Sequence, residues 1–302
     1  MTRAIEVVEV GPRDGLQNEA ALVSVANKVA LIRRCIAAGA RRIEIASFVN
    51  PRKVPQMADA EAVVEMLGRT ESVMRIGLVL NRRGAERAIA AGVDQLGAVA
   101  VASDTFGVRN QGQDTWQSVE EAKAIIAMAQ AAGRSAQVTI AAAFGCPFEG
   151  EIDPARVVGM ARELAKAGPC EVALADTIGV AVPAQVTALI TALRAGIAPL
   201  PVRVHFHDTR NTGVANVWAA VEAGAVTVDA SLGGLGGCPF APGAAGNVGT
   251  EDVAYLLARS GIETVLDLAR LIEASQWLSG IMGKALPASL AKAVPFPPLG
   301  QP

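Results

Sequence analysis

The sequence lacks an excess of charge, a cysteine framework and a long apolar run. It holds 27 Lys and Arg against 29 Asp and Glu. This balance argues against a nucleic-acid-binding protein, which normally carries a basic excess or stripe. The four cysteines (Cys35, Cys146, Cys170 and Cys238) form no Cys-x-x-Cys pair. That pattern indicates a reducing compartment in which an individual thiol can be reactive. No uninterrupted run of 18 apolar residues is present, so a membrane span is not expected.

Recognisable targeting signals are also missing. The start, MTRAIEVVEV, resembles neither a signal peptide nor a transit segment, and the end, LGQP, matches no peroxisomal or lipidation signal. We therefore expect a soluble, cytoplasmic protein without a membrane or nucleic-acid partner. Of the 302 residues, 51% are hydrophobic and 19% are charged, which excludes intrinsic disorder. A chain of this length buries about 75% of its unfolded surface and needs no disulfide or metal merely to fold.

Short β-rich runs alternate along the chain with longer segments of helical spacing. The runs lie at 5–10, 42–48, 75–80, 96–102, 137–144, 171–175, 202–207 and 226–232. The helical segments lie at 22–38, 56–67, 82–92, 115–132, 154–167, 183–195, 212–223 and near 250–259. Eight strand–helix units predict an α/β fold, a closed (β/α)8 TIM barrel. A doubly wound open sheet is the alternative.

No linker or change of composition divides the chain, which predicts a single domain over residues 1–302. We expect the barrel over about 4–260 and a short C-terminal helical extension over about 261–302. Residues 263–286 have helical spacing, and the tail AVPFPPLGQP is too rich in proline to continue that helix.

Both histidines of the chain lie in one stretch, His205-Phe206-His207-Asp208-Thr209. On a strand, residues i and i+2 point to the same face, so the two imidazoles should project together. This arrangement suits half of a divalent-metal site. A pair of hydrogen-bonded histidines inside the barrel fits the same pattern.

Further polar residues fall at the ends of other predicted strands. Arg13 and Asp14 follow the first strand, Glu44 lies in the second, Asp176 closes the sixth, and Asn247 follows the eighth. A barrel gathers the carboxyl ends of its strands into one mouth, where the active sites of this fold occur. Two of these positions also have an ordinary explanation: a turn or surface ion pair for Arg13-Asp14, and a helix N-cap for Asp176.

Residues 233–247 are rich in glycine and contain Cys238. Clustered glycines let a backbone move or approach a ligand closely, which favours a mobile loop carrying this thiol. A flexible surface loop with an incidental cysteine is the alternative. A dinucleotide-binding fingerprint fits poorly, because the flanking strand, helix and downstream acid are not arranged as a βαβ unit requires.

Six segments carry a more specific signal: VEVGPRDGLQNE (8–19), SFVNPRKVPQM (47–57), FGCPFEG (144–150), ADTIGV (175–180), HFHDT (205–209) and GLGGCPFAPGAAGNVGTED (234–252). Taken together, they resemble 3-hydroxy-3-methylglutaryl-CoA lyases, members of a wider superfamily of metal-dependent lyase and Claisen-condensing TIM barrels. The resemblance runs in register over about residues 4–285.

The resemblance implies a metal site and a set of catalytic roles. The ligands would be Asp14, His205, His207 and Asn247, a donor set that suits Mg²⁺ or Mn²⁺ better than a closed zinc site. Arg13 would bind the thioester carbonyl, and Cys238 would donate a proton from a mobile lid. Asp14, His205 or a metal-bound water would take the proton of the substrate hydroxyl. The remaining site residues, contacting substrate or orienting these groups, would be Gln17, Glu44 and Asp176.

The implied reaction is a retro-Claisen cleavage of an acyl-CoA thioester to acetyl-CoA and acetoacetate. The resemblance also implies a homo-oligomer. The sequence departs from the family at Arg210-Asn211, in the loop expected at 103–113, and at Ala175 before Asp176. These departures leave open a related 3-hydroxyacyl-CoA substrate, such as a citramalyl-CoA-like thioester. A Claisen-condensing synthase and a non-enzymatic metal-binding scaffold are further alternatives. The first motif and the lack of a large regulatory domain argue against the synthase.

Overall fold

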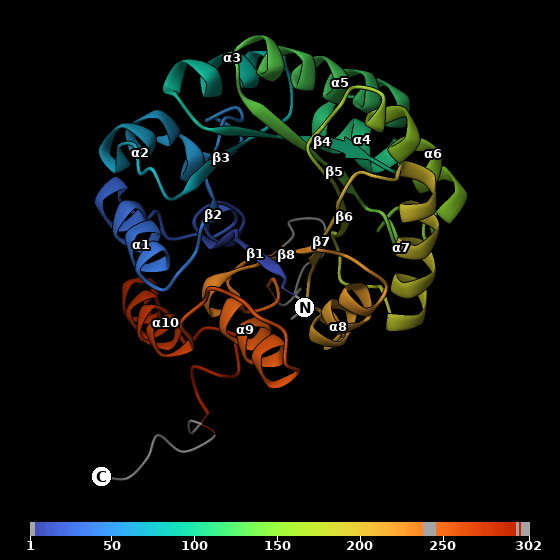
Figure 1. Cartoon of the computed structure of the whole chain (residues 1–302). Coiled ribbons are helices and arrows are strands. Elements are labelled where there is room, and N and C mark those ends of the chain that lie inside the picture. Colours follow the sequence, from blue (N-terminus) through green and yellow to red (C-terminus); the bar gives the residue numbers. More distant parts are fainter. Residues whose placement is uncertain (1–3, 238–245, 294–295, 297–302) are drawn as a thin grey trace, which may run out of the picture.

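The computed structural model describes residues 4–237, 246–293 and 296 (Figure 1). Its strands close into a parallel barrel in which each strand pairs with the next in sequence and β8 pairs with β1. The strands are β1 (Glu6–Glu9), β2 (Arg42–Ser47), β3 (Met74–Val79), β4 (Gln95–Val101), β5 (Ser135–Ala141), β6 (Val172–Asp176), β7 (Val202–Phe206) and β8 (Thr227–Ala230). The predicted TIM barrel is confirmed, and the open sheet is wrong.

Helices alternate with the strands and surround the barrel (Figure 1). They are α1 (Val25–Ala37), α2 (Ala60–Leu67), α3 (Arg82–Ala91), α5 (Thr115–Ala131), α6 (Pro154–Ala165), α7 (Pro183–Ile197), α8 (Gly213–Glu222) and α9 (Thr250–Arg259). Side-chain caps fix several starts: Ser24, Asn81, Asp114 and Asp153 each accept a hydrogen bond from a backbone N–H of the first turn. In the described parts of the chain, no helix is long and apolar enough to cross a membrane.

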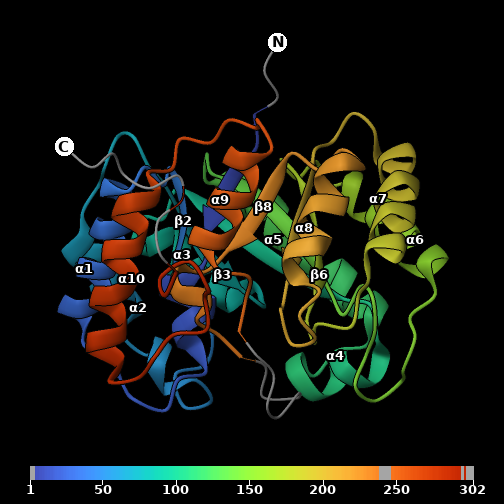
Figure 2. The same cartoon turned by 90° about the horizontal axis from the view of Figure 1, so that it is seen from below.

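Two helices lie outside this alternation. α10 (Leu268–Met282) falls within the predicted extension and packs beside α1 and α9 (Figure 1). α4 (Asp104–Gln111) lies beyond the carboxyl ends of the strands (Figure 2). It falls where the sequence suggested a loop, and that interpretation is wrong. Ser103 caps the helix by accepting from the Phe106 N–H at 3.1 Å, and the buried Phe106 ring anchors it to the core.

The strands place alternate side chains in two different environments. On β2, Ile43 and Ile45 belong to the apolar core between strands and helices, whereas Arg42 and Glu44 contact other charged groups inside the barrel. The same period of two recurs on β7, where Val202, Val204 and Phe206 join the apolar core. Arg203 and His205, on the other face, point inward. The register of the strands therefore determines which polar side chains reach the site.

Candidate active site at the carboxyl end of the barrel

Arg13 and Asp14 lie in a tight π-helical turn, Gly11–Gly15, directly after β1. The carbonyl of Val10 accepts hydrogen bonds from the N–H groups of Arg13, Asp14 and Gly15 at 3.1, 2.7 and 3.2 Å. A side chain at Gly15 would place its Cβ 2.7 Å from Ser231 Oγ, so only glycine allows the turn to approach the segment after β8 this closely. The turn thus brings two charged side chains over the barrel axis.

The two histidines meet Asp14 at this end of the barrel. His205 lies in β7 and His207 directly follows it, with ring centroids 5.2 Å apart. Their Nε2 atoms lie 3.8 Å (His205) and 3.9 Å (His207) from Asp14 Oδ2. The predicted common face of the imidazoles is confirmed. Asp14, His205 and His207 form a group able to hold a metal ion, since one donor atom from each lies within 4.8 Å of the others.

Asn247 completes the cluster from the segment after β8. Its Nδ2 donates to Asp14 Oδ2 at 2.9 Å and to the Leu235 carbonyl at 3.1 Å. Its Oδ1 is buried and has no hydrogen-bond partner among the residues that the structure describes. A buried amide oxygen without a partner is costly, and a bound cation would satisfy it. One carboxylate, two imidazoles and an amide oxygen are donors that fit a divalent metal.

Neighbouring charges set the protonation of this cluster. Burial raises the pKa of Asp14, but Arg13, His205 and His207 outweigh it and hold that pKa well below its usual range. Burial and the neighbouring His205 lower the pKa of His207 to about 4. A neutral His207 and an ionised Asp14 are the forms that bind a metal.

Arg13 is buried beside the cluster, so the alternative of a surface ion pair is wrong. Its Nε donates to Glu44 Oε2 at 2.7 Å, its Nη2 lies 2.5 Å from the same oxygen, and its Nη1 contacts Asp14 Oδ1. Burial lowers the pKa of Arg13, but Asp14 and Glu44 more than compensate and raise it. Arg13 is therefore a fixed, permanently charged donor next to the metal group.

The structure distributes the other predicted residues unevenly. Asp176 accepts from the N–H groups of Val180 and Ala181 at 2.9 and 3.0 Å, so its described bonds shape the turn before α7. The N-cap explanation is close, although α7 itself starts later, at Pro183. Gln17 is partly buried, and its Oε1 has no hydrogen-bond partner within the described part of the chain. Cys238 lies outside the described residues.

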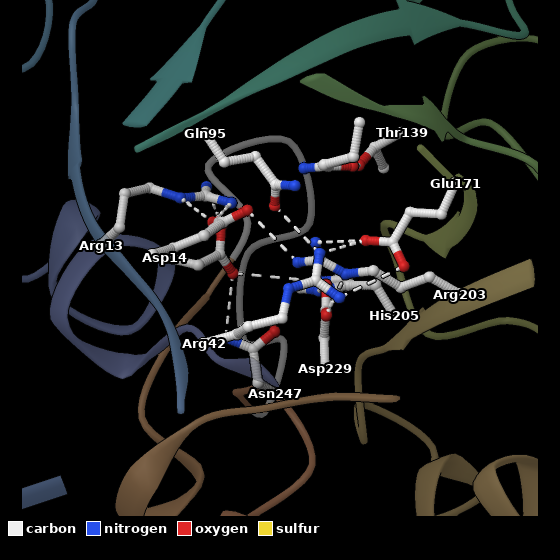
Figure 3. A network of polar contacts seen from close by, with 12 residues as sticks. Arg13, Asp14, Arg42, Gln95, Thr139, Glu171, Arg203, His205, Asp229 and Asn247 are labelled. Carbon is white, nitrogen blue, oxygen red and sulfur yellow. Dashed lines mark hydrogen bonds and ion pairs between the residues drawn. The ribbon is translucent and has the colours of Figure 1, made fainter. Parts of the chain in front are cut away.

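Four charged residues under the site were not predicted from the sequence. Asp229 Oδ2 lies 3.1 Å from His205 Nδ1, and Arg203 Nε lies 2.5 Å from the other oxygen of Asp229. Glu171 and Arg42 continue the network below them (Figure 3). Arg203 and Asp229 are lone charges between apolar residues of their strands, and Arg203 is two residues from His205. That spacing was the available signal, because it places Arg203 on the inward face.

Comparisons with known proteins agree with this geometry. The HMGL-like family profile matches residues 4–278. The chain is 45% identical to (R)-citramalyl-CoA lyase of Chloroflexus aurantiacus, over 98% of this chain and 96% of that protein. It is 38% identical to hydroxymethylglutaryl-CoA lyase YngG of Bacillus subtilis, over 95% of this chain and 96% of that protein.

A solved structure extends the likeness to three dimensions. An HMG-CoA lyase from Acinetobacter baumannii, in complex with coenzyme A and 3-methylmalate, superimposes with a TM-score of 0.94 at 40% identity. The match covers 99% of this chain and 97% of that chain. The family profile and these relatives span almost the entire sequence, so the chain belongs to the HMGL-like family and is a carbon–carbon lyase.

Proposed function

We propose that the chain cleaves 3-hydroxy-3-methylglutaryl-CoA to acetyl-CoA and acetoacetate. The observation that carries this proposal is the placement of Asp14, His205, His207 and Asn247 against the fixed guanidinium of Arg13. The first four offer ligands for a hard cation, and Arg13 offers a permanent positive charge beside them. A retro-Claisen cleavage needs both, because negative charge leaves a hydroxyl oxygen and arrives on a thioester oxygen.

Asp14, His205, His207 and Asn247 would hold Mg²⁺ or Mn²⁺. These cations prefer oxygen ligands, which Asp14, Asn247, water and the substrate would supply beside the two imidazoles. When bound, the cation lowers the pKa of the substrate hydroxyl and orients the acyl group. The unpartnered Oδ1 of Asn247 supports its inclusion in the ligand set.

The chain's own residues would then manage charge and protons. The hydroxyl at C3 would give its proton to Asp14, His205 or a bound water, and the C2–C3 bond would break. The electron pair of that bond moves to the thioester as an enolate, while C3 becomes a ketone. Arg13, held by Glu44, stabilises the enolate oxygen, and such a donor typically contributes about 10²–10³ in turnover. We assign the protonation of C2, which yields acetyl-CoA, to Cys238.

A second substrate, (R)-citramalyl-CoA, is favoured by the relative of that activity at 45% identity. In both thioesters, the carbon that carries the hydroxyl also carries a methyl group. The two differ by one methylene between that carbon and the free carboxylate. The same bond cleavage would release pyruvate in place of acetoacetate. One methylene in a pocket changes selectivity by about 10- to 200-fold, so one of the two substrates should dominate.

The test is acetyl-CoA release from each thioester with Mg²⁺, Mn²⁺ or EDTA. Chelator-sensitive release from the glutaryl compound supports the proposal, and a kcat/KM at least tenfold higher for the citramalyl compound replaces it with the second candidate. Cys238→Ser should lower kcat far more than it changes KM, whereas Cys170→Ser, at an exposed thiol, serves as the matched control. An unchanged kcat in Cys238→Ser would remove that thiol from the mechanism.

A further inference from the structure

Arg203 lies at the centre of the charged network beneath the site (Figure 3). We propose that Arg203 is a positioning residue. Through the carboxylates of Asp229 and Glu44, it holds the metal-binding His205 and the guanidinium of Arg13 in fixed positions relative to each other. This inference rests on the proposed function, because it assigns a role within the same site.

The contacts of Arg203 run in two directions toward the site. Its Nε lies 2.5 Å from Asp229 Oδ1, and its Nη2 lies 3.4 Å from Glu44 Oε1. Each carboxylate turns its second oxygen to a site residue: Asp229 Oδ2 faces His205 Nδ1 at 3.1 Å, and Glu44 Oε2 accepts from Arg13 Nε at 2.7 Å. One guanidinium therefore anchors both halves of the site.

These contacts fix the orientation of the His205 and Arg13 side chains as well as balancing the buried charges. The guanidinium of Arg203 is fully buried and planar, so its N–H groups fix the positions of the carboxylates they contact. A carboxylate can only accept, so Asp229 orients the Nδ1–H of His205 and leaves Nε2 facing Asp14. Glu44 in turn limits the rotation of the Arg13 head group. A loss of the Arg203 fork would loosen both groups without touching substrate.

A neighbouring arginine shows what a structural role alone looks like. Arg42 contacts Glu6, Gln95 and Glu171. Glu171 also lies 3.4 Å from Arg203 Nη1, but within the described residues none of the three contacts Arg13, Asp14 or His205. Arg42 therefore stabilises the lower part of the barrel without a direct link to the site.

Arg75 provides a matched control outside the network. It is buried, its Nε and Nη2 contact Asp94 at 2.8 and 3.0 Å, and its Nη1 donates to the Gly68 carbonyl at 3.0 Å. Arg75→Lys thus removes a buried guanidinium that makes several hydrogen bonds, as Arg203 does, and it leaves the contacts of the site in place.

The experiment compares Arg203→Lys, Arg42→Lys and Arg75→Lys by Mn²⁺ binding, monitored by electron paramagnetic resonance, and by steady-state kinetics. Lysine keeps the charge but cannot reach Asp229 and Glu44 together. Arg203→Lys should weaken Mn²⁺ binding about tenfold and lower kcat about 10- to 100-fold, the range typical of residues that orient metal ligands, with KM within about threefold. Arg42→Lys and Arg75→Lys should stay within about threefold in all three quantities.

Wild-type Mn²⁺ affinity and kcat in Arg203→Lys would overturn the inference, and so would equal losses in all three variants. If wild-type protein cleaves neither thioester, the proposed substrates fail, and the pattern of Mn²⁺ affinities alone decides the role of Arg203. Absence of Mn²⁺ binding to the wild-type protein overturns both. If circular dichroism shows Arg203→Lys unfolded, Asp229→Asn takes its place with the same expected loss, because it weakens one arm of the bridge at constant side-chain volume.

Discussion

The two faces of the same barrel strands have opposite chemistry. Toward the helices, residues such as Ile43 and Ile45 of β2 join one continuous apolar core. Toward the barrel axis, Arg42 and Glu44 of the same strand join a network of buried charges. The helix-facing layer gains stability from apolar area removed from water, and neighbouring side chains there can adjust to small changes of shape.

The axial layer obeys a stricter rule. A buried charge is tolerated only with a partner, and losing one partner typically costs about 3–5 kcal/mol because the other charge remains buried. Contacts join Arg13 to Glu44, Glu44 to Arg203, and Arg203 to Asp229. A change at one of these residues therefore moves the next. The comparison implies that changes in the helix-facing layer alter stability alone, whereas changes among the axial charges that contact Arg13 or His205 alter activity as well.

The largest expected effect sharpens the comparison on the axial side. Asp14→Ala removes the carboxylate that contacts Arg13, Asn247 and both histidines, so turnover should fall by at least about 10³, the upper range for losing one stabilising group. Thermal melting should still show a folded barrel. Asp153→Ala, which removes the N-cap of α6, should cost only about 1 kcal/mol of stability and leave turnover intact.

Full metal-dependent turnover by Asp14→Ala would exclude Asp14 from the ligand set. It would also show that the axial charges serve stability alone.

The next effect concerns the helix-facing layer. Ile125 on α5 is fully buried, so Ile125→Ala should destabilise the protein by about 2–5 kcal/mol through lost burial and a cavity. Measured well below the melting temperature, kcat should stay within about twofold. Glu120→Ala, exposed on the same helix, should change stability by less than about 0.5 kcal/mol. A tenfold fall in the kcat of folded Ile125→Ala would mean that the two layers are not separable.

The fold could be predicted from the sequence because short β-rich runs alternate regularly with longer segments of helical spacing. All eight strands and the alternating helices lie at the predicted segments, with ends that differ by a few residues. α4 was the exception, since Asp104–Gln111 carries Gly107 and few apolar residues. Its helix depends on the Ser103 cap and on burial of Phe106, and the burial is a tertiary effect that local spacing does not encode.

The site was only partly readable. The spacing of His205 and His207 predicted their common face, but spacing alone did not connect them to Asp14, which is distant in sequence; the family resemblance supplied that link. Arg203 and Asp229 show why the rest was missed. They are 26 positions apart on adjacent strands, and their pairing depends on the register of β7 against β8. A lone charge in an apolar run indicates a buried position, but neither the face of the strand nor the partner.

Glu9 breaks the comparison, because it is a carboxyl group in the helix-facing layer. It lies on the same face of β1 as Val7, and burial raises its pKa to about 7. Oε1 accepts from the N–H groups of Gly11 and Leu232 at 2.7 and 2.9 Å, and Oε2 accepts from Thr250 Oγ1 at 2.7 Å. Glu9 therefore links the turn that carries Asp14 to the segment after β8.

The smallest expected effect is a pH dependence of stability. Because burial raises the pKa of Glu9 from its ordinary value of 4.5 to about 7 in the folded chain, the folded state binds more protons than the unfolded state between these limits. Stability should therefore fall as pH rises from about 4.5 to 7, by at most about 3 kcal/mol from this group. Glu9→Gln keeps an oxygen for the two N–H donors and does not titrate, so urea unfolding at pH 5 and pH 8 should show a smaller loss than in wild type. Identical losses would mean that Glu9 stays ionised in the folded protein, and that the helix-facing layer tolerates a charge as the axial layer does.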